Sequence, residues 1–474
     1  MPRSYADAVD KLNGLQTNFA VLEAVRKTGG SANKDAIPEM VDFVRRSGYE
    51  PSDFDDLNMI HVTGTKGKGS TCALAESILR NYNGKIKTGL YTSPHLMEVR
   101  ERIRINGTPL SQDLFAKYFF EVWDRLDSTG DKSKPGYFRF LTVLAFHVFK
   151  QEKVDVAILE VGVGGAYDST NIIHKPIVCG VAALGIDHVS VLGSTLGEIA
   201  WNKGGIFKAG VPAVTSQQPK EGLDMLESRA KELKADSLRV VQPFTSSQLG
   251  DVTVGLAGRH QVANAALATA LCRTWVEKVL GEKVDDDVPQ EFVKGIASAR
   301  WPGRGQIMVR NNRPKITWFF DGAHTAESIQ VCADWFKDAS SQNGKKILVF
   351  NCTGPRDGDT LLGPLAKIQS MVQFDRAIFT PAITFASNTY KGDLVNNNAP
   401  MDLELKTQKT LAACWSKQVA IAGGGEAATT ILPSIEHSVN WIDDYAKSED
   451  IQVLVTGSLH LVGGVQSVLG CEVI

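Results

Sequence analysis

The feature that most constrains this fold is a glycine-rich loop between a short apolar segment and a helical one. Residues 59–62, Met-Ile-His-Val, have the composition of a buried strand, and residues 72–80 have a helical pattern. Between them, residues 63–71 read Thr-Gly-Thr-Lys-Gly-Lys-Gly-Ser-Thr. Glycines let backbone N–H groups close around phosphate oxygens, and a helix N-terminus adds partial positive charge. This order predicts an α/β domain that binds phosphate.

The loop departs from the common phosphate-loop pattern G-x-x-x-x-G-K-[ST]. Lys68 occupies the lysine position, from which it would reach the β- and γ-phosphates, and Ser70 or Thr71 would help to hold the metal or the phosphate. Val62 stands where the first glycine is expected, and Gly69 separates Lys68 from Ser70. The sequence therefore predicts a nucleotide-binding loop of a particular kind.

The bulk properties exclude several classes of protein. A chain of 474 residues is too long for one ordinary core, so two or three domains are expected. A net charge of -2 gives no electrostatic case for binding nucleic acid. No apolar run reaches the roughly 18 residues that a membrane span needs. The 7 cysteines form no Cys-x-x-Cys motif, and the N-terminus mixes acidic with basic residues, so a cytoplasmic location is expected. A mitochondrial form made from a longer precursor stays open.

Strand–loop–helix units recur along the first part of the chain. Strands alternating with helices predict a mostly parallel α/β sheet, with ligands at the carboxyl ends of its strands. Gly14 argues against one unbroken helix in the N-terminal stripe of apolar residues. The expected elements are strands at 86–92, 154–159, 177–184 and 211–215, a helix at 138–150, and helices within 1–50 marked by Val9, Leu12, Leu15, Phe19, Leu22 and Val25.

A second, smaller Rossmann-like domain is expected from residue 301 onward. Proline and glycine in residues 301–305, Trp-Pro-Gly-Arg-Gly, suit a linker. We thus predict a P-loop ATPase domain over residues 1–300 and a C-terminal domain over 301–474. Within the second domain we expect strands at 316–320, 346–350, 376–380 and 452–456, and an irregular insertion at 383–425.

Polar side chains follow several predicted strands of the first domain. Ser93, Glu160 and His188 stand at strand ends, as the phosphate loop does. A hydroxyl, a carboxylate and an imidazole can share magnesium ions that bridge ATP phosphates, although histidine is a less usual ligand. Each residue also has a structural alternative. Lys68 could be a turn residue, Ser93 a helix cap, Glu160 a paired buried carboxylate, His188 a core histidine, and Lys203 a surface lysine.

The second domain offers a weaker signal of the same kind. Asp321 and His324 follow a predicted strand in Phe-Phe-Asp-Gly-Ala-His, and Arg304 lies in the glycine-rich linker, flexible enough to reach a phosphate. The alternatives are a helix cap for Asp321 and a solvated side chain for Arg304. Residues 162–165, Gly-Val-Gly-Gly, could suggest a dinucleotide turn, but their spacing does not fit one.

Taken together, these segments resemble the folylpolyglutamate synthases of the eukaryotic type, within the Mur ligase superfamily. No segment is decisive alone, but the ordered set is specific, and only residues 220–255 and 383–440 match poorly. The segments are Gly-Thr-Lys-Gly-Lys-Gly-Ser-Thr (64–71), Ser-Pro-His-Leu (93–96), Val-Arg-Glu-Arg-Ile-Arg-Ile-Asn-Gly (99–107), Tyr-Phe-Arg-Phe-Leu-Thr (137–142), Glu-Val-Gly-Val-Gly-Gly-Ala-Tyr-Asp (160–168), Leu-Gly-Ile-Asp-His (184–188), Lys-Gly-Gly-Ile-Phe-Lys (203–208), Trp-Pro-Gly-Arg (301–304), Asp-Gly-Ala-His-Thr (321–325) and Thr-Gly-Ser-Leu-His-Leu-Val-Gly-Gly (456–464).

The resemblance implies a role for each candidate residue. Ser93, Glu160 and His188 would bind two magnesium ions, and Lys203 matches a lysine that is carbamylated in the family. Residues 137–142 and the surroundings of the phosphate loop are candidates for the folate pocket. The residues implied in ATP binding are Gly64, Thr65, Lys66, Gly67, Lys68, Gly69, Ser70, Thr71, Asn264, Arg304 and Asp321, with His324 close by; those implied in catalysis are Lys68, His188, Lys203 and His324.

The resemblance also implies an activity. The chain would be an ATP-dependent ligase that adds L-glutamate to tetrahydrofolate and folylpolyglutamates through an acyl phosphate, acting as a monomer in one-carbon metabolism. The resemblance also allows a monovalent cation as a further bound ion. The nearest alternative is a bifunctional dihydrofolate synthase/folylpolyglutamate synthase. A peptidoglycan ligase, or an ATP-binding regulatory module without ligation, fits the motifs less well.

Overall fold

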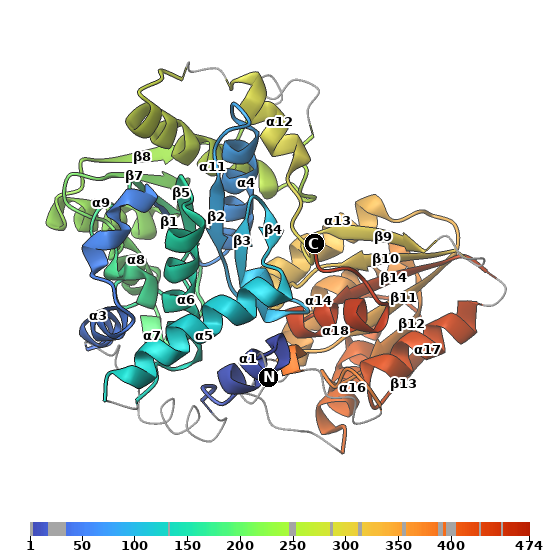
Figure 1. The fold of residues 1–474 in the computed structure, drawn as a ribbon. Helices are drawn as coiled ribbons and strands as arrows, with labels where there is room; N and C mark the ends of the chain where they lie inside the picture. The colour runs from blue at the N-terminus through green and yellow to red at the C-terminus, as the bar shows by residue number, and fades with distance from the viewer. Residues whose placement is uncertain are drawn as a thin grey trace. The chain divides into compact units, whose positions relative to one another are not determined.

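The computed structural model describes residues 3–17, 35–130, 133–245, 253–284, 288–310, 315–352, 357–386, 392–394, 404–425, 428–446 and 449–474 (Figure 1). The chain divides into two compact units. Unit 1 comprises residues 1–95, 99–255 and 259–300, and unit 2 comprises residues 96–98, 256–258 and 301–474.

Unit 1 is built on an eight-stranded sheet with the order β4-β3-β2-β5-β1-β6-β7-β8. Six of its strands run parallel, whereas β3 is antiparallel to both β2 and β4. The mostly parallel sheet is as predicted. Its strands are β1 (Ile60–Thr63), β2 (Thr88–Tyr91), β3 (Ile103–Ile105), β4 (Thr108–Pro109), β5 (Val156–Glu160), β6 (Val178–Val181), β7 (Pro212–Ser216) and β8 (Ser237–Val241).

Helices cover both faces of this sheet. The strand register places Gly180 of β6 and Gly89 of β2 on opposite faces of the sheet. A Cβ added to Gly180 would meet Leu271 of α11, and one added to Gly89 would meet Phe149 of α6. The helices α11 and α6 therefore cover opposite faces. The helix α4 packs with α11 and α12. The helices are α1 (Tyr5–Asn13), α3 (Ala36–Arg46), α4 (Lys68–Asn81), α5 (Gln112–Ser128), α6 (Tyr137–Glu152), α7 (Val189–Leu192), α8 (Leu196–Gly204), α9 (Lys220–Glu232), α11 (Gln261–Trp275) and α12 (Gln290–Ser298).

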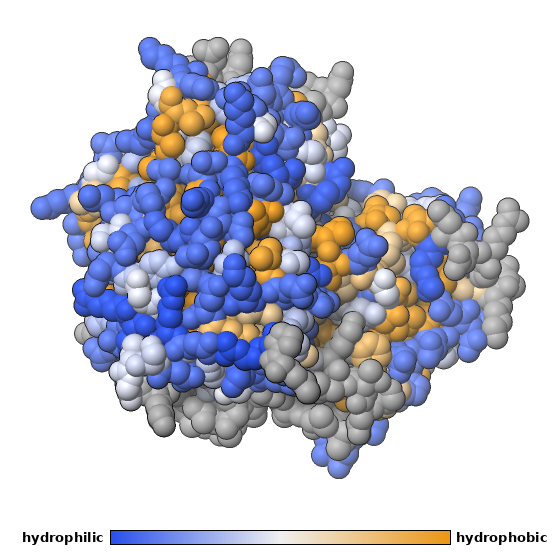
Figure 2. All heavy atoms as spheres, in the orientation of Figure 1, coloured by the Kyte–Doolittle hydropathy of each residue, from blue (hydrophilic) through white to orange (hydrophobic). Residues whose placement is uncertain are grey.

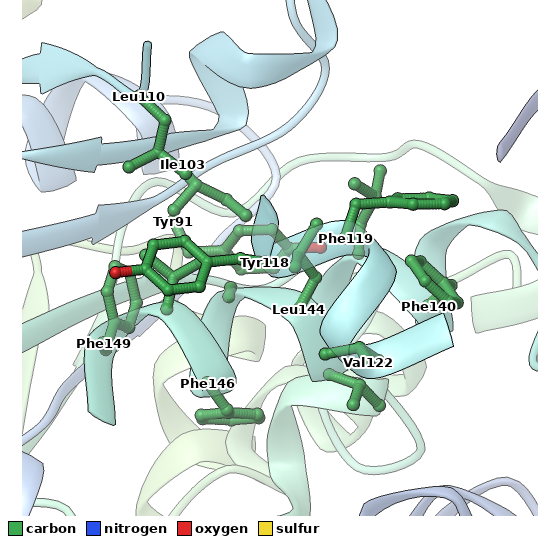
Figure 3. Packing of buried hydrophobic residues seen from close by; sticks show 14 of the residues in the cluster. Tyr91, Ile103, Leu110, Tyr118, Phe119, Val122, Phe140, Leu144, Phe146 and Phe149 are labelled. Carbon is green, nitrogen blue, oxygen red and sulfur yellow. The ribbon is translucent and has the colours of Figure 1, made fainter. Parts of the chain in front are cut away.

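The largest apolar cluster of unit 1 fills the space between the sheet and the pair α5 and α6 (Figure 3). Phe119 of α5 packs against Phe140 of α6, with ring centroids 4.8 Å apart. Tyr91 of β2 and Ile103 of β3 supply the floor of the cluster, and both are fully buried. This core fixes the ends of β2 and β3, where candidate residues follow.

Unit 2 is a second three-layer α/β unit, with a six-stranded sheet of order β13-β12-β11-β14-β10-β9. Of the strands in this sheet, only β9 is antiparallel to its neighbour. The side chains of β10 alternate between the two faces of the sheet. Trp318 and Phe320 pack into the core on one face, and Phe319 packs into the core on the other. The strands are β9 (Gln306–Arg310), β10 (Ile316–Phe320), β11 (Lys345–Phe350), β12 (Phe374–Phe379), β13 (Ala428–Ile431) and β14 (Ile451–Thr456). The helices are α13 (Ala326–Ala339), α14 (Gly358–Lys367), α15 (Gln369–Val372), α16 (Lys406–Ile421), α17 (Ile435–Tyr445) and α18 (Leu459–Val468).

The surface shown in Figure 2 is largely hydrophilic over unit 1. On unit 2, exposed apolar side chains include Ile307 and Val309 of the edge strand β9. No helix in the described ranges is long and apolar enough to cross a membrane.

Three local predictions need correction or completion. The helix after the phosphate loop begins at Lys68, not at residue 72, so the end of the loop already forms the first helical turn. The segment 383–425 is not an irregular insertion throughout, because α16 buries Leu411, Trp415 and Val419 at helical spacing. The first helix ends at Asn13 with Gly14 as its C-cap, as Gly14 suggested, while Phe19, Leu22 and Val25 lie outside the described residues.

Candidate active site

The candidate residues of unit 1 gather at the carboxyl edge of its sheet. Since the strands β2, β5, β1 and β6 are neighbours in that order, the segments that follow them meet at one edge. Ser93 follows β2, Glu160 ends β5, the phosphate loop follows β1, and His188 follows β6. The parallel sheet therefore brings together residues far apart in the sequence.

The phosphate loop has a backbone that requires glycine at two positions. Gly67 is the N-cap of α4, with φ +82°, and a Cβ there would lie 2.3 Å from Oδ1 of Asn264. Gly64 has φ +151°, and a Cβ there would lie 2.8 Å from the Cβ of Ala182. The first turn of α4 leaves N–H groups without partners in the helix, as an anion site requires.

Two lysines converge on one carbonyl oxygen of the loop. The Nζ atoms of Lys68 and Lys203 both donate to the Gly64 carbonyl, at 3.1 Å and 2.8 Å. Neither forms an ion pair with any residue in the described part of the chain. Burial lowers the pKa of Lys203 from 10.5 to about 7, and the Lys68 ammonium adds to this shift. The loop thus carries positive charge that an anion would neutralise.

Lys66 has a different environment, because its Nζ pairs with Oδ2 of Asp187 at 3.1 Å. Burial would raise the pKa of Asp187, but Lys66 and His188 together outweigh this effect through their charges and hydrogen bonds, and the pKa is lowered to about 2. The adjacent His188 has φ +52°, and its pKa is lowered, first by burial and then by Lys68 and Lys203, against the opposing effect of Asp187. Asp187 was not predicted, although it directly precedes His188 in the sequence.

Ser93 and Glu160 are joined at neighbouring strand ends. The backbone N–H of Ser93 donates to Oε2 of Glu160 at 3.0 Å, and Glu160 is 5% exposed. A carboxylate and a hydroxyl are hard oxygen donors, the type that Mg²⁺ prefers. Among the residues that the structure describes, no three His, Cys, Asp or Glu side chains form a metal-binding group. The donors present therefore fit an ion that takes most of its ligands from phosphates and water.

Asn264 of α11, which the family resemblance implies in ATP binding, lies against Gly67 of the loop. Its Nδ2 donates to Oε1 of Gln261 at 2.8 Å, and Nε2 of Gln261 donates to the Ser70 hydroxyl at 3.4 Å. Gln261 is 1% exposed and was missed by the sequence analysis. Its position three residues before Asn264, one helical turn away, is a signal that could have found it.

The segment after β6 supports the phosphate loop from the side. The backbone N–H groups of Thr65 and Lys66 donate to the Ala183 carbonyl, and the Thr65 hydroxyl exchanges hydrogen bonds with the backbone of Gly185. Gln218 holds this segment from beyond β7, accepting from the Leu184 N–H at 2.9 Å. No periodic signal marks Gln218, which the sequence analysis also missed.

In unit 2, the candidate residues cluster where β10 ends and β9 begins. Oδ2 of Asp321 accepts from the Gly305 N–H and Oδ1 from the Ala323 N–H, both at 2.9 Å. A Cβ on Gly322 would lie 2.4 Å from Nη1 of Arg304, so the guanidinium passes directly over that glycine. His324 bonds through Nδ1 to the Gly322 carbonyl at 2.9 Å.

Several structural alternatives are now decided. Lys203 is 3% exposed, so it is not a surface lysine. His188 keeps access to solvent, although neighbouring residues partly desolvate its ring, so it is not a core histidine. Ser93 is not a helix cap, because residues 94–98 form no helix, and the cap of α13 is Thr325 rather than Asp321. A 3₁₀ turn, not an opening α-helix, follows residues 162–165, which excludes the dinucleotide turn.

Comparison with known proteins identifies the relatives of this chain. A family profile described as "Dihydrofolate synthetase, C-terminal domain" matches residues 306–468. The solved structure of Mycobacterium tuberculosis folylpolyglutamate synthase complexed with ADP and AMPPCP has a TM-score of 0.72 and 23% identity, covering 96% of this chain and 99% of its own. That likeness shows the fold.

Two curated relatives carry the assignment further. Folylpolyglutamate synthase of Saccharomyces cerevisiae (strain ATCC 204508 / S288c) is 47% identical, covering 98% of this chain and 86% of its own length. Folylpolyglutamate synthase of Candida albicans is 44% identical, covering 100% of this chain and 97% of its own length. Identity at this level over nearly the full length shows that the chain belongs to the folylpolyglutamate synthase family.

Proposed function

We propose that this chain uses ATP to join L-glutamate to the γ-carboxylate of tetrahydrofolate and of folylpoly-γ-glutamates, releasing ADP and phosphate. The carrying observation is the phosphate loop, where Lys68 begins α4 and its Nζ donates to the Gly64 carbonyl without an ion-pair partner in the described ranges. Such a site suits the phosphates of a nucleotide. Lengthening the anionic tail would retain folates in the cell and support one-carbon metabolism.

The first step would activate the folate. One oxygen of the γ-carboxylate attacks the γ-phosphorus of ATP, the bond to the β,γ-bridging oxygen breaks, and ADP leaves. The product is an acyl phosphate. Lys68 and the first-turn N–H groups of α4 are placed to stabilise the negative charge on the transferred group.

The second step would form the amide. The neutral amine of L-glutamate attacks the carbonyl carbon of the acyl phosphate, and a tetrahedral intermediate forms. Its collapse breaks the carbon–oxygen bond to phosphate, which leaves, while the amine gives up a proton to water. Water must be kept away from the acyl phosphate, because hydrolysis would waste ATP. We assign ATP contacts in unit 1 to residues 64–71 and Asn264, and in unit 2 to Arg304 and Asp321, with His324 assisting.

Two magnesium ions would be held by Ser93, Glu160 and His188 together with the phosphates of ATP. When bound, such ions neutralise phosphate oxygens and so assist attack on phosphorus. We also propose that Lys203 becomes carbamylated: its neutral amine adds to CO₂, a nitrogen–carbon bond forms, and the proton passes to water. The product is anionic and carboxylate-like, which would replace a positive charge beside the metals by a negative one.

The remaining assignments concern the whole protein. We propose that unit 1 is the ATP-binding domain and also carries the folate site, with residues 137–142 as one of its walls. Unit 2 is then the C-terminal ligase domain. We further propose that the protein acts as a monomer in the cytoplasm.

The ligase activity has a direct test. We expect the purified protein to convert ATP to ADP only when tetrahydrofolate and L-glutamate are both present, and mass spectrometry should find folate lengthened by glutamate. No lengthened folate under these conditions would refute the proposal. Dihydropteroate with glutamate serves as the second arm, since robust ligation of that pair would favour the bifunctional alternative.

Carbamylation of Lys203 gives a prediction with a defined pH dependence. At pH 7.5 an ordinary lysine is neutral in about one molecule in a thousand, whereas a pKa of about 7 leaves most Lys203 amines neutral and able to attack CO₂. With ¹³C-labelled bicarbonate, ¹³C NMR should show a carbamate signal. At fixed CO₂ the signal should fall as the pH drops through about 7, because the ammonium form cannot attack.

Matched variants assign that signal. Lys203→Arg should lack it, because a guanidinium forms no carbamate under these conditions, and Lys66→Arg should keep it. A carbamate signal that persists in Lys203→Arg would contradict the assignment.

A further inference from the structure

Arg102 is a buried cation without an acidic partner among the residues that the structure describes. Its side chain is 9% exposed, at the end of the 3₁₀ turn Val99–Arg102 that precedes β3. Within the described ranges, one hydrogen bond holds the guanidinium, from Nε to Nδ1 of His95 at 3.0 Å. No carboxylate of the described residues forms an ion pair with it. Because a buried charge is costly unless it is compensated, this guanidinium calls for an anion from outside the chain.

The contacts of Arg102 leave one end of its fork available. An arginine can only donate, so Nδ1 of His95 must be the unprotonated acceptor nitrogen. The guanidinium carbon also lies 5.3 Å from the ring centroid of Tyr137, the first residue of α6. These contacts orient the side chain through Nε and one face. They leave the two Nη groups available, and this pair of groups can bind a carboxylate in a bidentate manner.

Arg102 lies at the same sheet edge as the candidate active site. In the antiparallel pair β2–β3, Tyr91 stands opposite Ile103, and the next N–H, that of Thr92, donates to the Arg102 carbonyl at 3.0 Å. Ser93 follows directly and binds Glu160. Ile103 points into the apolar cluster beneath (Figure 3). In the sheet order, β5 lies between β2 and β1, and β3 lies on the other side of β2. Arg102, just before β3, is therefore farther from the phosphate loop than Ser93 is. The distance from Arg102 to the loop along this edge is roughly 10 Å or more.

We propose that Arg102 binds the α-carboxylate of the terminal glutamate of the folate substrate. The γ-carboxylate must approach the ATP phosphate near Glu160 and Ser93. The α-carboxylate is joined to it by a short aliphatic chain, so it reaches the next anion site along the edge, which Arg102 supplies. The Lys68 ammonium is left for the nucleotide. This assignment rests on the ligase reaction proposed above.

The pairing of Arg102 with the α-carboxylate can be tested by comparing two substrates on two proteins, the wild type and Arg102→Gln. The substrates are tetrahydrofolate and its analogue with 4-aminobutyrate in place of glutamate, which keeps the carboxylate to be activated but lacks the α-carboxylate. We expect the wild-type protein to prefer tetrahydrofolate by about 10- to 100-fold in kcat/KM, the range of a charged hydrogen-bonded pair. Arg102→Gln should lose this preference by slowing only the reaction of tetrahydrofolate. Its KM for ATP should stay unchanged.

Controls separate this role from a structural one. Arg100→Gln removes a nearby arginine whose Nη1 binds the Leu110 carbonyl, and it should keep the wild-type preference. Arg102→Lys keeps the charge but not the fork, so its preference should fall by at least about threefold. If Arg102→Gln shows no cooperative melting and so is not folded, Arg102→Lys tests the proposal instead, through the same ratio of kcat/KM for the two substrates. Where the analogue turns over too slowly, its inhibition constant replaces kcat/KM.

Three results would overturn the proposal. Equal losses on both substrates in Arg102→Gln would make the residue structural. A raised KM for ATP with an unchanged preference would assign it to phosphate. An unchanged preference in both Arg102 variants would leave it no part in binding the α-carboxylate. Failure of the wild-type protein to lengthen tetrahydrofolate would instead refute the ligase proposal.

Discussion

Lys68→Ala is expected to lower kcat/KM for folate ligation by about a thousandfold or more, the scale of a charged group acting on a transferred phosphoryl group. The protein should remain folded, because Lys68 makes one hydrogen bond, to the Gly64 carbonyl, which Lys203 also satisfies. The melting temperature should therefore change by no more than about 3 °C. Mass spectrometry of the folate products and calorimetry measure the two effects.

A matched substitution strengthens that result. Lys85 is exposed and lies beyond the end of α4, away from the phosphate loop, so Lys85→Ala should ligate at the wild-type rate. Retained turnover in Lys68→Ala would show that the phosphate lysine has been misassigned.

Glu160→Gln is expected to lower the ligation rate by about 100-fold or more at low Mg²⁺, with partial recovery as the Mg²⁺ concentration rises. Glutamine has nearly the same shape and can still accept the Ser93 N–H, so the change removes the charge and leaves the backbone contact. Rates measured across a series of Mg²⁺ concentrations would show the half-saturating concentration moving upward. The same Mg²⁺ dependence as in the wild-type protein would argue against Glu160 as a metal ligand.

Glu76→Gln provides the control for a buried carboxylate. Glu76 is 4% exposed and accepts from Arg80 and from Thr88, at the amino end of β2, opposite the active-site edge. Weakening this ion pair should lower the melting temperature while the Mg²⁺ dependence stays unchanged. The pair of variants separates loss of a site charge from loss of stability.

Much of the fold could be predicted because its signals are local. The strand β10 was predicted at its observed bounds, and α6 and β5 within a few residues, since buried parallel strands and long apolar helices carry strong patterns. The strands β3, β4, β8, β9 and β13 were missed. The strands β3 and β4 are only three and two residues long, and β8, β9 and β13 lie at the margins of a sheet and are partly exposed, so their sequences carry little of the pattern of a buried strand.

The candidate site divides in the same way. That the phosphate loop, Ser93, Glu160 and His188 gather at one edge of the sheet could be predicted, because each stands at the end of a recognisable strand or soon after it. The pairing of Lys66 with Asp187 and the support from Gln218 were not found, since both join segments of the chain that are adjacent only through the order of strands in the sheet. Local periodicity holds no information on that order.

The sequence by itself determined that a phosphate-binding loop stands between a strand and a helix, and that its surroundings resemble one family of ligases. Only the tertiary structure decided that Lys203 shares the Gly64 carbonyl with Lys68 across 139 residues. It likewise decided that Arg102 is buried without an acidic partner in the described residues. The physical reason is that burial and charge pairing arise between elements brought together by the sheet, whereas loop and helix patterns arise within one segment.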